Sequence, residues 1–67
     1  MVIQVNKMIK LEDKSANIYL NHPVYGISGY QLGILEEVRV SPSTGEQEFW
    51  VRNSYGLIQF SYFCIVV

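Results

Sequence analysis

Apolar and polar residues alternate along most of the chain, which is the pattern of strands in a half-buried sheet. A first alternation runs over residues 2–12, interrupted only by Lys7, and a second over residues 16–21. Because proline fixes φ and has no backbone N–H, we expect the second strand to end at or just before Pro23. The intervening EDKS segment predicts a turn.

The segment NHPVYGISGYQLG, residues 21–33, breaks the alternation and holds three of the five glycines. Its glycines do not have the G-x-G-x-x-G spacing of a phosphate-binding loop, and no helix pattern follows them. We expect Gly29 and Gly33 to serve tight turns or close packing of strands. A bend that enters a strand near Gln31 is the first reading, and a binding loop that carries Tyr25 and Tyr30 is the alternative.

The segments QLGILEEVRV and EQEFWVRN predict two long strands joined by a hairpin whose loop is residues 42–45. Placing Ser41 opposite Glu46 sets Val38 against Phe49, whereas a slip by one residue would set Val38 and Val40 against Glu48 and Glu46. Such a slip would move a whole apolar face into water. The predicted pairs are Val38 with Phe49, Arg39 with Glu48, Glu37 with Trp50, and Leu35 with Arg52.

This register has one consequence for function: Phe49 and Val51 point inward, so Trp50 points outward between Glu48 and Arg52. The chain then continues through an NSYG turn, a short LIQF strand and a final FCIVV strand, with a 3₁₀ turn expected at residues 61–62. The predicted fold is a single all-β domain over residues 1–67, a small five- to six-stranded antiparallel barrel with one 3₁₀ turn.

Two segments carry a resemblance to known families. GLIQFSYFCIV is similar to the end of SH3 domains, where a 3₁₀ turn with a tyrosine, here Tyr62, precedes the last strand. SGYQLGILEEV resembles the KOW element of ribosomal and transcription proteins through Gly29, Gly33 and Val38. The resemblance implies an SH3-like barrel and a binding role. The chain lacks the acidic-aromatic opening motif of SH3 domains, and Gln59 stands where they have a proline, so binding of proline-rich peptides is not implied.

Charge and composition narrow the class of partner. The formal net charge is −1, and the five Lys and Arg residues are scattered, with three near the first turn. A nucleic-acid-binding domain usually has a basic patch. One cysteine rules out an internal disulfide, and we expect neither a signal peptide nor a membrane span. The expected location is the cytoplasm.

Two residues could carry chemistry. His22 could act as a general base near neutral pH, but no acidic residue lies near it in the sequence, so an ordinary loop histidine is favoured. Cys64 could be a nucleophile, a metal ligand or, in the last four residues CIVV, a prenylation site. A buried cysteine in a terminal strand is the favoured interpretation. We therefore predict no enzyme, cofactor or metal.

The aromatic residues are the stronger lead, because nine of them exceed what so small a core needs. We expect a non-enzymatic module that docks on a larger protein, and small acidic barrels of this type resemble phage or mobile-element accessory and inhibitor proteins. The predicted protein-binding residues are Trp50, Arg52, Tyr25, Tyr30, Tyr55, Glu37 and Glu48.

Two further possibilities stay open. Nucleic-acid binding by a KOW-like module is the alternative function, with stacking of bases on aromatic rings. A homodimer through an unpaired edge strand, residues 2–11 or 63–67, is the expected form of self-association.

Overall fold

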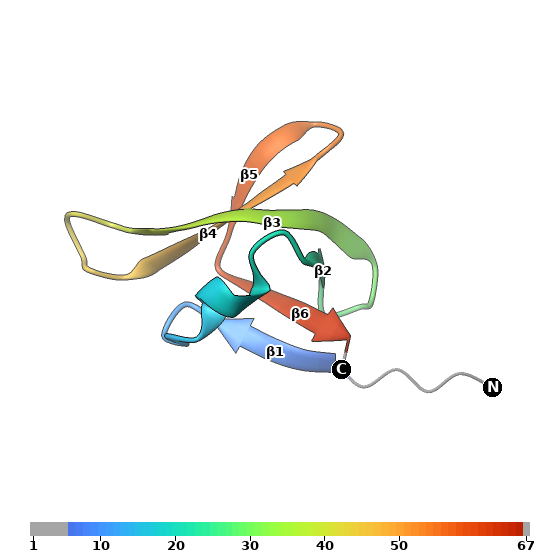
Figure 1. Ribbon diagram of the computed structural model, residues 1–67, viewed down its shortest axis with the longest axis horizontal. Helices are drawn as coiled ribbons and strands as arrows, with labels where there is room; N and C mark the ends of the chain where they lie inside the picture. The colour runs from blue at the N-terminus through green and yellow to red at the C-terminus, as the bar shows by residue number, and fades with distance from the viewer. Residues whose placement is uncertain (1–5, 67) are drawn as a thin grey trace.

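The structure, a computed structural model, describes residues 6–66 and contains six strands in one antiparallel sheet (Figure 1). The order across the sheet is β1-β6-β2-β3-β4-β5. The strands are β1 (Asn6–Lys10), β2 (Pro23–Tyr25), β3 (Gln31–Val40), β4 (Gln47–Asn53), β5 (Gly56–Phe60) and β6 (Tyr62–Val66). A single 3₁₀ helix, η1 (Ala16–Tyr19), is the only helical element in the described part of the chain.

The predicted all-β class is confirmed, and the six antiparallel strands agree with the predicted number of five to six. Within residues 6–66 the sheet is open, because β1 and β5 are its two edges and no ladder joins them. Closure of the sheet into a barrel therefore stays a prediction.

The first and last described strands lie side by side, with Ile9 of β1 opposite Phe63 of β6. Because β6 lies between β1 and β2, the expectation that residues 63–66 form a free edge is wrong, whereas β1 is an edge as predicted. Residues 2–5 of the first predicted strand, and Val67 of the last, lie outside the described residues.

The core is formed where the most deeply buried side chains of the sheet meet. The rings of Phe49 and Phe63 pack edge to face with centroids 5.1 Å apart, and the ring of Tyr19 packs against Phe63 in the same way. Burial of each large apolar side chain here stabilises the folded state by about 1.5–3 kcal/mol. The buried cluster consists of Ile9, Ala16, Val24, Leu32, Leu35, Phe49, Val51, Phe63 and Ile65.

Residues 16–21 form η1 and a turn, so the strand predicted there is wrong. The amide of Ile18 donates to the carbonyl of Ser15, and Ile18 is 73% exposed, so the apparent alternation does not mark a buried face. Only Ala16 is buried. The chain then reverses at Asn21, whose φ is 65°. The backbone amide of Asn21 donates to the carbonyl of Leu35 in β3.

Two further boundaries differ from the prediction. Pro23 begins β2 instead of ending a strand, a position where its missing N–H is tolerated. The 3₁₀ turn predicted at residues 61–62 is absent, because Ser61 is a single bend between Phe60, which pairs with Phe49, and Tyr62, which pairs with Lys10. The chain passes directly from one ladder to the other.

The β3–β4 hairpin has the predicted register at three pairs, in which Val38, Arg39 and Glu37 oppose their expected partners. The predicted fourth pair is wrong, because a β-bulge between Leu35 and Glu37 shifts the register, and Leu35 faces Val51. The extra residue, Glu36, lets Leu35 remain buried in the core.

The bend predicted in the glycine-rich segment is confirmed for residues 26–30, which connect β2 to β3, whereas residues 23–25 of that segment form the unpredicted strand β2. Gly26 donates to the carbonyl of Tyr30, and Gly29, with φ of 91°, donates to the carbonyl of Gly26. Gly33 lies inside β3 with φ of 149°, and a Cβ there would lie 2.3 Å from the carbonyl oxygen of Arg52. Glycine is thus required at this position, where the backbone of β4 leaves no room for a side chain.

Candidate functional site

The outward face of β3, β4 and β5 gathers most of the predicted binding residues. Side chains paired directly across antiparallel strands share a face, so the buried Phe49 and Val51 place their neighbours on the opposite side. We call this face the Trp50 surface. It consists of Ile34, Glu36, Glu37, Arg39, Glu48, Trp50, Arg52, Leu57 and Gln59.

Trp50 points outward as predicted, but its ring is only half-exposed. The guanidinium carbon of Arg39 lies 4.7 Å from the ring centroid, so a cation–π contact covers one face of the indole. The indole Nε1–H is fully covered, and no acceptor for it exists among the described residues. An exposed Trp50 side chain was expected, whereas the side chain in the structure is partly covered.

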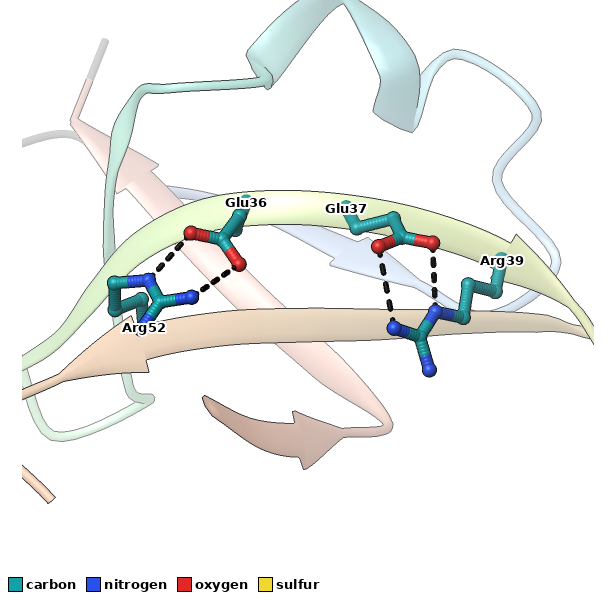
Figure 2. A network of polar contacts seen from close by, with 4 residues as sticks. All are labelled: Glu36, Glu37, Arg39 and Arg52. Carbon is teal, nitrogen blue, oxygen red and sulfur yellow. Dashed lines mark hydrogen bonds and ion pairs between the residues drawn. The ribbon is translucent and has the colours of Figure 1, made fainter. Parts of the chain in front are cut away.

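Two bidentate ion pairs lie on the Trp50 surface (Figure 2). Arg39 donates from Nε and Nη2 to Glu37 at 2.6 and 3.2 Å, within the same strand. Arg52 donates from Nε and Nη2 to Glu36, the Nη2 contact being 2.8 Å, and this pair joins β4 to the bulge of β3. The bulge therefore supplies the second carboxylate of the Trp50 surface.

These contacts fix the charge states of the surface. The hydrogen bonds from Arg52 lower the pKa of Glu36, and those from Arg39 lower the pKa of Glu37. Both arginines have a raised pKa for the same reason. The four side chains are charged at neutral pH and largely neutralise one another.

Two of the predicted tyrosines are exposed near one end of the β3–β4 hairpin. Tyr55 is 90% exposed in the β4–β5 turn, and Tyr30 is 61% exposed before β3. The side-chain amide of Asn53 donates to the carbonyl of Leu32, which ties the end of β4 to the start of β3. Tyr30 and Tyr55 therefore flank the same end of the hairpin, with Ile27 also exposed in the adjoining loop.

Tyr25 is not part of this group. It is half-buried on β2, opposite Cys64 of β6, in the other half of the sheet. Sequence reasoning also missed five members of the Trp50 surface, which are Ile34, Glu36, Arg39, Leu57 and Gln59. The predicted register already placed Arg39 beside this face, and that signal could have revealed its contact with Trp50.

The two residues considered for chemistry lie in ordinary surroundings. His22 is exposed, with Nδ1 3.1 Å from the carbonyl oxygen of Pro23 and its ring against that of Tyr19. Cys64 is 4% exposed and lies opposite Met8 and Tyr25 of the flanking strands. Within residues 6–66, no three His, Cys, Asp or Glu side chains come together as a metal site would require.

A shallow hollow of about 380 Å³ lies elsewhere, at the corner where β1 meets β6. Its charged side chains are Lys10 and Glu12, whereas Lys7 projects from the opposite face of β1. The lysines near the first turn thus do not form one basic patch. The described part of the chain contains no helix of the length and apolarity that a membrane crossing demands.

Comparison with known proteins identifies no relative of this chain. No protein-family model, curated protein or solved structure matches the chain.

Proposed function

We propose that the protein is a non-enzymatic module that docks on a larger protein through the Trp50 surface. The observation that carries this proposal is the state of Trp50: a large indole on the outside of the sheet, half-covered by Arg39, with an N–H that has no acceptor among the described residues. Buried Trp N–H groups usually find a partner, and Trp and Arg are the residues most enriched at binding hot spots.

The arrangement indicates the chemistry of the partner surface. A partner that presents a carboxylate to Arg39 competes with Glu37, and movement of the guanidinium uncovers the indole and its N–H. A backbone carbonyl beside that carboxylate then accepts the Nε1–H bond. The apolar side chains of Ile34 and Leu57 widen the contact, and the exposed Tyr30 and Tyr55 extend it at one end.

We further propose that the chain is related to the SH3-like barrels. This relationship is supported by the pairing of the last strand with the first in an antiparallel sheet of short strands. We also propose a cytoplasmic setting and a role as an accessory or inhibitor of a larger assembly, of the phage or mobile-element type.

The test uses Trp50 as its own reporter, because it is the only tryptophan in the chain. A partner captured with the intact protein is purified and titrated against it, and binding is followed by calorimetry and by indole fluorescence. Trp50→Ala should weaken binding by about thirtyfold or more, as a central hot spot does. Arg39→Lys, which keeps the charge but loses the planar stacking group, should have a smaller effect.

Tyr62→Ala is the matched control, since Tyr62 is also a half-buried aromatic residue but lies on β6, away from the Trp50 surface. It should leave the affinity unchanged. Equal loss in both variants, or none in Trp50→Ala, would contradict the proposal. A steep fall of affinity with added salt would instead favour the nucleic-acid alternative, because release of counterions dominates binding to phosphates.

A further inference from the structure

The two edge strands of the open sheet differ in how well they are protected against pairing with strands of other molecules. Within the described residues, β5 pairs only with β4, and β1 pairs only with β6, so each presents one row of unpaired backbone groups. Figure 1 shows the β4–β5 hairpin projecting from the sheet on the side away from β1. An exposed strand edge of this kind is a template for another strand.

The sequences of the two edges are of opposite character. Strand β1 reads NKMIK and has two lysines in five residues, a common device that keeps other strands away. Strand β5 reads GLIQF and has no charged residue. Its central side chain, Ile58, is 38% exposed even though it points to the core side of the sheet, where its paired neighbour Val51 is buried.

We propose that β5 pairs with β5 of a second copy of this chain, antiparallel and about a twofold axis at Ile58. In this register Ile58 meets Ile58 of the other copy, and Leu57 meets Gln59. Gly56 lies opposite Phe60, an aromatic side chain that covers the bare glycine of an edge strand. Two sheets of six strands become one continuous sheet.

We expect a second copy of this chain to pair with β5, because the sequence of β5 is compatible with itself in the antiparallel register. An uncharged strand has no preference for a charged peptide, and every antiparallel pair in this register joins residues that tolerate each other without like-charge repulsion. Five residues bury less surface than the ~1,200 Å² of a tight interface, so the dimer should form reversibly with concentration.

The pairing would also duplicate the Trp50 surface. A twofold axis perpendicular to the sheet leaves both outward faces on the same side. The two indoles then lie about 15 Å apart, estimated from the spacing of strands and the rise per residue. The significance of bringing two Trp50 surfaces together rests on the proposed function, whereas the pairing of β5 does not. The pairing is therefore tested with this chain alone.

Sedimentation equilibrium of the intact protein, over about a hundredfold range of concentration, should show a shift from 7.7 kDa towards twice that mass. Ile58→Lys places like charges opposite each other at the axis and should abolish the shift. Met8→Lys is the matched control, because Met8 is also 38% exposed and central, but on β1. It should dimerise like the intact protein. Circular dichroism establishes that each variant is folded.

A second pair of variants tests the register without touching the core face. One chain carries Leu57→Glu with Gln59→Glu, and the other carries Leu57→Lys with Gln59→Lys, all on the outward side of β5. Each chain alone should sediment as a monomer, and an equimolar mixture should form a heterodimer. A monomeric intact protein at every concentration, or a dimer broken by Met8→Lys and not by Ile58→Lys, would overturn the proposal. The docking function would be unaffected.

Discussion

The two faces of the β3–β4 hairpin are built from adjacent residues yet differ in almost every physical property. On the inner face, Leu35, Phe49 and Val51 are completely buried. On the outer face, the neighbouring Trp50 is half-exposed beneath a guanidinium, and the same face carries two ion pairs that solvent reaches. Because strand residues alternate sides, stability and recognition are assigned to alternate positions of the same segment. Substitutions can therefore separate the two properties.

The sharpest separation comes from Phe49 and Trp50. Phe49→Ala removes a buried ring that packs on Phe63, and it should cost about 3–5 kcal/mol of the free energy of unfolding. A domain of this length has only about 3–10 kcal/mol in total, so the variant should be largely unfolded. Trp50→Ala should cost less than half as much. Urea unfolding followed by circular dichroism measures both, and equal losses would show that the two faces are not distinct.

Gly33 is the point where the two faces cannot be separated, because the constraint is on the backbone. Gly33→Ala should cost about 2–4 kcal/mol, since its φ of 149° is strained for alanine and the new Cβ would meet the Arg52 carbonyl. Gly45→Ala is the control: its φ is 75°, but nothing lies within 4 Å, so only the strain of about 1 kcal/mol remains. Thermal unfolding measures the difference. Equal shifts would mean that the close approach of β3 to β4 is not tight.

The inner face and the hairpin could be predicted because their determinants are local. Apolar alternation, a turn with Pro42 and Gly45, and the cost of a slip together fix the pairing near the loop. The bulge at Glu36 was missed, although the unbulged register opposes Leu35 to Arg52 and Glu36 to Val51, and these mismatches indicate one extra residue in β3. The direction of Trp50 followed from its neighbours, whereas its cover by Arg39 depends on a choice of rotamer.

Long-range contacts were the second limit of prediction. The side-chain amide of Gln47 is buried and donates to the carbonyls of Leu11 and Asp13, more than thirty residues earlier in the chain. These bonds hold the turn after β1 against β4. Alternation places Gln47 inside but does not identify its acceptors. The same is true of η1, whose residues alternate like a strand, although the turn at Ser15 and the left-handed Asn21 decide its path.

The smallest expected effect distinguishes the faces by pH, because the carboxylates lie on the outer face. Glu36 and Glu37 have a pKa below the ordinary 4.5 when folded, so the unfolded chain takes up protons first as the pH falls. The stability that their ion pairs contribute is therefore fully present above about pH 4.5 and is lost as the pH drops through the lowered pKa. Glu36→Gln should be slightly less stable at neutral pH and should lose less on acidification. Val51→Ala, an inner-face control, should be less stable at every pH but keep the full acid dependence. Urea midpoints measured between neutral and acidic pH test this, and an unchanged acid dependence in Glu36→Gln would show that its pair with Arg52 does not persist in solution.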